Sequence, residues 1–109
     1  MKQGEVILTP FPFSNLEKEK LRPSVIISND NYNKKFEDIL VVPMTSNLNV
    51  REYTISLTNK DLEKGKLLKD SLIKVDRIFS INKNLVRLKI GRINQAKLKE
   101  IKNIILGLL

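Results

Sequence analysis

The chain has 109 residues, a length that fits one domain with a hydrophobic core of its own, and we expect residues 1–109 to form a single domain. It contains no Cys and no His, which excludes disulfides, a thiolate nucleophile, Cys-based metal sites and the usual acid/base catalyst of neutral pH. The net charge of +8 favours a polyanionic partner, although a Lys-rich solvated surface would give the same balance. No apolar run approaches the ~20 residues of a membrane span, and no signal-peptide segment is seen, so we expect no membrane contact and a cytoplasmic location.

The N-terminal segment predicts one strand followed by a polar loop. Residues 5–9 alternate their apolar side chains as a strand does, and Pro10 ends the run in front of two aromatic residues. One of them, Phe13, fits either a packed corner of the core or a platform on which an RNA base stacks. Residues 14–20 form a charged loop that contains no Gly.

The next two strands are predicted to be buried. Pro23 stands where a strand begins, and the β-branched run of residues 25–27 suits a strand that is covered on both faces. After a turn or a single helical turn, residues 39–44 predict a central strand. This strand ends in the hydroxyl side chains of Thr45 and Ser46.

The second half of the chain predicts further short strands. Residues 53–57 alternate as a half-buried strand, and residues 59–65 are typical of a short cap that ends in a Gly turn. Leu67 and Leu68 begin another buried segment. Residues 71–78 predict the next strand.

A basic strand and a helix complete the pattern. Residues 86–90 alternate apolar side chains with Arg87 and Lys89, which predicts a strand with one basic face. Asn94 is a suitable N-cap for an amphipathic helix, whose apolar residues recur at helical spacing with Lys97 on the opposite, polar face. Short antiparallel strands with one terminal helix indicate a mainly β protein built as a small, partly closed barrel.

Motifs along nearly the whole chain follow the order seen in a known family. They are Gly4-Glu5-Val6, the Arg22-Pro23 strand that runs into Ser28-Asn29, the strand that ends in Thr45-Ser46, the stretch from Gly65 to Ile78, Ile90-Gly91-Arg92 and the closing helix. The ordered set resembles the toxin endoribonucleases of the MazF/PemK (Kid) family of type II toxin–antitoxin systems.

The resemblance implies a fold, a mode of assembly and a partner. The fold would be an SH3-like, partly open barrel with a C-terminal amphipathic helix, and two such barrels would pair as a homodimer. An acidic antitoxin protein would block the substrate groove, in keeping with the net charge of +8. The activity would be metal-independent cleavage of single-stranded RNA (mRNA) at a short sequence, with no cofactor.

Arg22 and Thr45 are the leading catalytic candidates. RNA cleavage without a metal uses the 2′-hydroxyl as the nucleophile, so the protein has to hold the phosphate and neutralise developing charge. A guanidinium binds phosphate oxygens with two N–H groups, and a hydroxyl can donate to a further oxygen, for which Ser46 is a weaker substitute. The resemblance points to the same pair. The alternatives are an ion pair between Arg22 and a loop glutamate, and a Thr45 hydroxyl that caps its own turn.

The proton acceptor and the base contacts are less well defined by the sequence. Without His a carboxylate would have to act as the base, and the resemblance places such a residue in the loop of residues 14–20. Glu17 and Glu19 are the candidates for the catalytic carboxylate and are otherwise solvated loop residues. Asn47, with Asn49 and Arg51, is a candidate loop contact to bases. Lys74, Asp76 and Arg77 are candidate substrate contacts, and the last two are alternatively ion-pair residues on the barrel rim.

Two other functions fit the same barrel. A toxin that poisons DNA gyrase by protein binding would not need the pair of Arg22 and Thr45. A non-catalytic RNA-binding barrel is favoured if the loop without Gly spoils the groove. A neighbouring gene for a short protein with an acidic C-terminal tail would support either toxin and would count against the third function.

Overall fold

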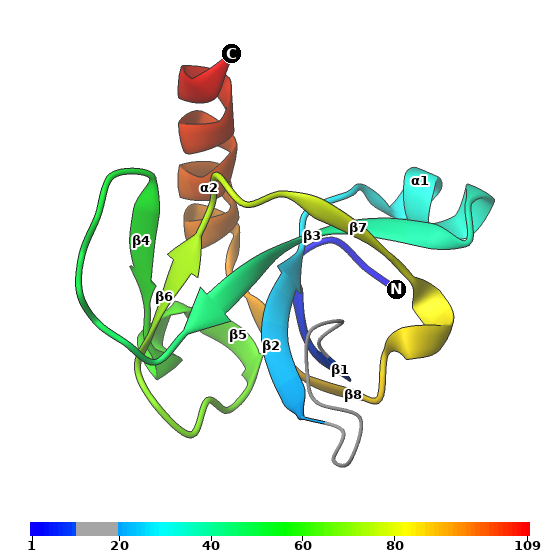
Figure 1. The fold of residues 1–109 in the computed structure, drawn as a ribbon, viewed down its shortest axis with the longest axis horizontal. Coiled ribbons are helices and arrows are strands. Elements are labelled where there is room, and N and C mark those ends of the chain that lie inside the picture. Colours follow the sequence, from blue (N-terminus) through cyan, green and yellow to red (C-terminus); the bar gives the residue numbers. More distant parts are fainter. Residues whose placement is uncertain (11–19) are drawn as a thin grey trace.

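The computed structural model describes residues 1–10 and 20–109. Its strands are β1 (Glu5–Pro10), β2 (Leu21–Ile26), β3 (Asp38–Thr45), β4 (Thr54–Leu57), β5 (Leu62–Gly65), β6 (Ser71–Lys74), β7 (Phe79–Asn82) and β8 (Leu88–Ile93). Its α-helices are α1 (Asp30–Lys35) and α2 (Gln95–Leu108), and single 3₁₀ turns lie at Asn59–Asp61 and Lys83–Leu85 (Figure 1). In the described part of the chain, no helix has the length and apolar content that crossing a membrane requires.

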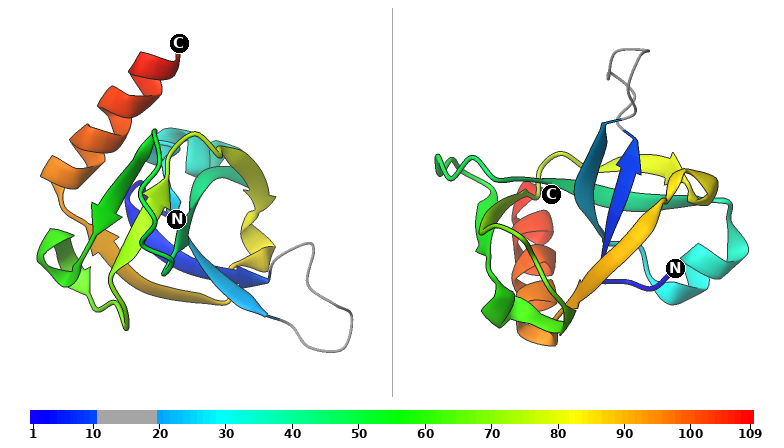
Figure 2. Two further views of the ribbon diagram at one scale, coloured as in Figure 1. Left: turned by 60° about the vertical axis from the view of Figure 1, so that its left-hand side comes forward. Right: turned by 90° about the horizontal axis from the view of Figure 1, so that it is seen from below.

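The strands form one antiparallel sheet that curls into a half-barrel (Figure 2). Along the sheet the order is β4-β6-β3-β2-β1-β8-β5, and β7 pairs with β3 beside this path. β3 belongs to three ladders, because its first part pairs with β2 and β7 while Met44 and Thr45 pair with β6. The predicted mainly β, partly open barrel with a C-terminal helix is therefore confirmed.

Two hydrophobic cores lie on opposite faces of the sheet. Val25 of β2 belongs to the larger core, which α2 completes with Leu98 and Ile101. The neighbouring Ile26 belongs to the smaller core. Because successive side chains of a strand point to opposite faces, the predicted burial of this strand on both faces is confirmed for these two residues.

Helix α2 begins as the sequence predicts. The side chain of Asn94 accepts a hydrogen bond from the backbone N–H of Lys97 at 2.8 Å, which is an N-cap. The helix then runs away from the barrel, and Leu109 at its end is 95% exposed (Figure 2). The prediction that Lys97 lies on the exposed face is wrong. Its ammonium lies 3.8 Å from Asp61 and 3.2 Å from Glu100, because the 3₁₀ turn at Asn59–Asp61 packs against the first turn of α2.

Two predicted strands have different bounds in the structure. The strand predicted over residues 53–57 starts at Thr54, because Tyr53 has a φ of 64° that no strand residue adopts. The strand predicted over residues 71–78 breaks after Lys74, where the backbone N–H of Arg77 closes a turn onto the Lys74 carbonyl. β6 and β7 follow different parts of the curved β3, and one straight strand could not follow both.

The largest correction concerns residues 59–65, where the sequence predicted only a cap and a turn. Leu62–Gly65 is strand β5, and it pairs with β8. Gly65 has a φ of +81°, and a Cβ atom there would lie 2.1 Å from the carbonyl oxygen of Ile90. Gly65 therefore permits close backbone pairing with β8. The following Leu68, predicted to be buried, is 98% exposed, while Leu67 is buried as expected.

The strand predicted over residues 86–90 is shifted along the chain. Strand β8 runs from Leu88 to Ile93, because the 3₁₀ turn at Lys83–Leu85 and the residues after it still belong to the connection from β7. Arg87 nevertheless contacts β1, since its backbone N–H donates to the Leu8 carbonyl at 2.9 Å.

Candidate functional site

The register of β2 and β3 brings the two leading catalytic candidates together. Ser24 pairs with Pro43, and continuing this antiparallel register by two residues sets Arg22 opposite Thr45. Side chains two residues apart on a strand point to the same face, so Arg22 and Thr45 lie on one face of the sheet. Both line one groove of about 730 Å³, together with Ser46.

The lining of this groove combines apolar residues with basic and hydroxyl side chains. Leu8 of β1, Pro23 of β2 and Met44 of β3 are among the apolar residues that line it. Its cations and hydroxyls are Lys20, Arg22, Lys66, Lys69, Thr45, Ser46 and Ser71. The described residues that line it include no carboxylate. Such a groove attracts an anion that also carries apolar surface, and a strand of nucleic acid is a ligand of this kind.

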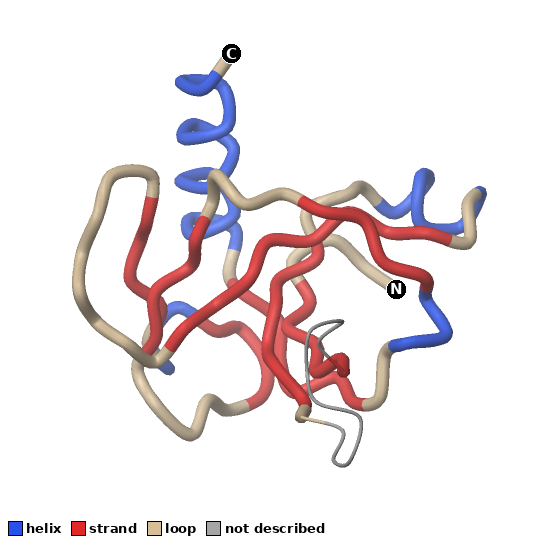
Figure 3. The backbone as a smooth tube through the Cα atoms, in the orientation of Figure 1, coloured by secondary structure: helices blue, strands red, loops and turns tan. Residues whose placement is uncertain are grey.

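Long connections surround the groove. Residues 46–53 join β3 to β4, and residues 66–70 join β5 to β6, and both connections run as loops beside the C-terminal end of β3 (Figure 3). Lys66 and Lys69 were not among the predicted site residues, yet the second connection carries both into the groove. The signal that could have found them is the Lys-rich stretch on either side of Leu67, once β5 is recognised as a strand.

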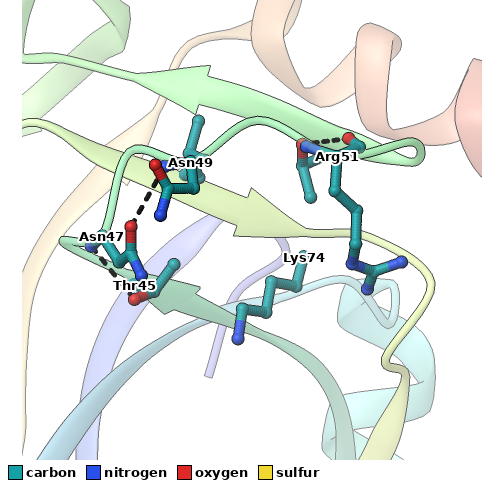
Figure 4. A pocket seen from close by; sticks show the side chains of 7 residues that line it. Thr45, Asn47, Asn49, Arg51 and Lys74 are labelled. Carbon is teal, nitrogen blue, oxygen red and sulfur yellow. Dashed lines mark hydrogen bonds between the residues drawn. The ribbon is translucent and has the colours of Figure 1, made fainter.

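A smaller hollow of about 160 Å³ also has Thr45 in its lining, so the two hollows adjoin at this residue (Figure 4). The predicted substrate contacts Asn47, Asn49, Arg51 and Lys74 line it, together with Thr54 and Leu72. The backbone N–H of Asn47 donates to the Thr45 hydroxyl oxygen at 3.1 Å. Thr45 thus stabilises its own turn as an acceptor, and its O–H can still donate to a ligand.

Asp76 and Arg77 line neither hollow. Asp76 accepts two hydrogen bonds from the guanidinium of Arg51, at 2.9 and 3.1 Å. This pairing holds the pKa of the Asp76 carboxyl below its ordinary value, and the hydrogen bond from Arg51 is the main cause. Asp76 therefore supports Arg51, in agreement with the ion-pair alternative. Arg77 lies exposed in the turn after β6.

The remaining candidates, Phe13, Glu17 and Glu19, lie outside the described residues. The structure therefore places seven of the predicted residues around two adjoining hollows: Arg22, Thr45, Ser46, Asn47, Asn49, Arg51 and Lys74.

The fold and the groove define a class of protein: a small β half-barrel with a terminal helix and a basic groove for a polyanion. The family model described as "PemK-like, MazF-like toxin of type II toxin-antitoxin system" matches residues 2–109. The chain belongs to this family, as predicted.

Similar proteins agree with this assignment. Endoribonuclease MazF of Staphylococcus saprophyticus is 33% identical over 108 residues, a match that covers 96% of this chain and 88% of the relative. A mycobacterial endoribonuclease in complex with its cognate antitoxin has the same fold, with a TM-score of 0.80 at 18% identity over 100% of this chain and 97% of that one. A MazE-MazF structure from Deinococcus radiodurans has a TM-score of 0.81 at 17% identity over 99% and 94% of the two chains.

Proposed function

We propose that this chain is a sequence-specific, metal-independent endoribonuclease that cleaves single-stranded RNA as the toxin of a type II toxin–antitoxin pair. The toxin class follows from the family that residues 2–109 match, and the 33% identical relative is named an endoribonuclease. One observation supports the catalytic site: Arg22 and Thr45 lie on one face of the sheet and line the same groove.

The chemistry is a transesterification within the RNA. The 2′-hydroxyl oxygen attacks the adjacent phosphorus and loses its proton, and the bond from phosphorus to the 5′ oxygen breaks. The products are a 2′,3′-cyclic phosphate and a 5′-hydroxyl, which takes up a proton. Arg22 neutralises charge on the phosphate oxygens, and the Thr45 O–H donates to one of them. Each donor fixed in this way contributes about 3 kcal/mol to lowering the barrier.

Proton transfer requires a further group. The described groove residues supply cations and hydroxyls, so the carboxylate has to come from elsewhere. Glu17 and Glu19 are the candidates in this chain. If neither reaches the substrate, positioning by Arg22 and Thr45 carries most of the rate.

The substrate and the partners follow from the groove and the relatives. Single-stranded RNA exposes its base edges and faces to a protein, whereas the deep major groove of a duplex hides them. Relatives of known structure are seen with their antitoxins, and an acidic antitoxin suits the four cations of this groove. We also propose that the chain acts in the cytoplasm as a homodimer of single-domain protomers.

A non-catalytic RNA-binding barrel is the second candidate function. It is favoured by the lack of a carboxylate among the described residues of the groove. A gyrase-poisoning toxin is disfavoured, because protein binding would not require Arg22 and Thr45 to share a groove.

The test is cleavage of a long single-stranded RNA in EDTA, with the cut ends mapped. Wild type, Arg22→Ala and Thr45→Ala are compared, with Lys102→Ala and Ser80→Ala as controls of matched chemistry on exposed positions away from the groove. The proposal is supported if wild type and both control variants cut the RNA at discrete sites in EDTA while Arg22→Ala and Thr45→Ala do not. RNA that wild type binds with strong salt dependence but leaves intact supports the non-catalytic barrel instead.

A further inference from the structure

The small hollow next to Thr45 lies where the neighbour of a cleaved nucleotide would reach. Thr45 lines both the groove and the hollow, so the hollow adjoins the place where Arg22 and Thr45 would hold a phosphate. Leu72, which pairs with Thr45 across the β3–β6 ladder, is 4% exposed and gives the hollow an apolar floor. Lys74 lies two residues further along β6, on the same face.

Three side-chain oxygens around this hollow, those of Thr45, Asn47 and Thr54, each already accept one hydrogen bond. The Asn47 side-chain oxygen accepts from the backbone N–H of Asn49 at 3.1 Å, and since an N–H only donates, this contact fixes the orientation of the amide. The Thr45 oxygen accepts from Asn47. The Thr54 hydroxyl donates to the Arg51 carbonyl at 2.5 Å and accepts from the Arg51 N–H at 3.3 Å.

The groups that remain for a ligand are mainly donors. They are the NH₂ of Asn47, the O–H of Thr45 and the ammonium of Lys74, for which the described residues offer no hydrogen-bond or ion-pair partner. The amide oxygen of Asn49 and a second lone pair on the Asn47 oxygen can still accept, but the donors, which include the charged Lys74, outnumber them. The hollow therefore suits a ligand edge that consists of acceptors.

Asp76 holds the donor set in place from outside the hollow. Its two hydrogen bonds with Arg51 tie the loop of residues 46–53 to the turn after β6. A second tie runs from the backbone N–H of Val75 to the carbonyl of Tyr53 at 3.0 Å. The guanidinium keeps further N–H groups that can donate to a ligand.

We propose that this hollow recognises one base of the RNA next to the scissile phosphate, that it selects uracil or guanine through the keto oxygen, and that Asp76 is the positioning residue of this subsite. The inference rests on the proposed function, since it assumes RNA in the groove. Uracil offers O4 and guanine offers O6 and N7 as acceptors. Cytosine and adenine carry an NH₂ group at the same place, which would face the donors of Lys74 and Asn47.

Cleavage of short oligonucleotides tests the inference. Each oligonucleotide carries one mapped cut site. The flanking bases are exchanged between uracil and cytosine or between guanine and adenine, which replaces a keto oxygen by an NH₂ group, an acceptor by a donor, with little change in size. At one flanking position we expect the keto base to raise kcat/KM about 10- to 100-fold over its amino counterpart. Asn47→Ala and Lys74→Ala should lower that ratio about tenfold, while Lys102→Ala keeps it.

The role of Asp76 is tested by the base preference of cleavage, because a general loss of structure would lower activity on all bases alike. Asp76→Asn should lower the base ratio at the same position and leave the ratios at other positions unchanged, and Asp76→Glu should restore part of it. Variants that reduce kcat/KM equally for all bases would overturn the inference, as would a preference for adenine or cytosine at every flanking position.

A binding experiment separates this inference from the proposed function. Fluorescence anisotropy compares oligouridine with oligocytidine on wild type and on Lys74→Ala. A protein that cuts no RNA but binds oligouridine about tenfold more tightly, and loses this preference in Lys74→Ala, keeps the subsite and refutes the nuclease. A protein that cuts RNA without any keto preference keeps the nuclease and refutes the subsite.

Discussion

The close pairing of β5 with β8 predicts a graded series of glycine substitutions. An alanine Cβ at Gly65 would lie 2.1 Å from the Ile90 carbonyl oxygen, one at Gly91 would lie 2.7 Å from the Lys64 carbonyl oxygen, and one at Gly107 meets nothing within 4 Å. The first two contacts are with backbone atoms, which cannot swing aside as a side chain can. The expected order of destabilisation is therefore Gly65→Ala, then Gly91→Ala, with Gly107→Ala neutral or stabilising.

The magnitudes follow from two effects. The positive φ of Gly65 costs an alanine about 1–2 kcal/mol. Forcing extra volume between two packed strands adds about 1–3 kcal/mol. Gly65→Ala should therefore lower the free energy of unfolding by about 2–5 kcal/mol, whereas Gly107→Ala, on the helix, should raise it by about 0.5 kcal/mol.

Urea unfolding followed by far-UV circular dichroism measures the series. For a protein of this size, Gly65→Ala should lower the urea midpoint by about 1–3 M at an unchanged slope. The Ile90 carbonyl also accepts the backbone N–H of Lys66 at 3.2 Å, and both residues line the groove, so RNA cleavage should fall as well. A midpoint for Gly65→Ala within experimental error of that for Gly107→Ala would refute the close approach of the two strands.

Three further predictions concern the site. Thr45→Val, which removes the O–H donor at nearly constant size, should lower kcat about 100- to 1,000-fold, while Thr45→Ser should keep most of the activity, as single-turnover cleavage would measure. The pKa of Asp76 is lowered in the folded protein by its pairing with Arg51. This pairing therefore contributes its full stabilisation above the ordinary pKa of 3.8, and the stabilisation is lost as the pH falls through the lower pKa of the folded protein. Acid unfolding of wild type and Asp76→Asn should accordingly differ by a constant amount above pH 3.8 and converge below it, and a difference that grows on acidification would contradict the pairing. RNA binding should weaken with a log–log salt slope of up to about −3 for the four cations of the groove, and Lys66→Ala should reduce the slope by about 0.7 in an anisotropy titration.

Sequence reasoning succeeded where local pattern and fold agree. The β-branched run that follows Pro23 predicted a strand covered on both faces, and Asn94 predicted the start of α2, because both signals act within a few residues. The groove pair needed more than local pattern. Arg22 and Thr45 lie far apart in the chain, and the ordered motifs of the family resemblance brought them together before any register was known.

The errors come from contacts that are distant in sequence. β5 is short and has little strand pattern of its own, and it exists because Gly65 lets its backbone approach β8. Lys97 has the place of a solvated residue in the helical pattern, yet Asp61, from a turn more than thirty residues earlier, draws it into the interface. The position of Tyr53 outside its predicted strand likewise depends on φ, which alternation of side chains cannot reveal.

The change of partner along β3, from β2 and β7 to β6, has a mechanical consequence for the groove. Arg22 belongs to the β1–β2 side of the sheet, whereas Thr45 is hydrogen-bonded toward β6, so the pair straddles a seam between two half-sheets. A small rotation of one half-sheet against the other would change the separation of the guanidinium and the hydroxyl, with no local rearrangement of either strand. A protein partner that wedges these halves apart could silence the site without touching either side chain.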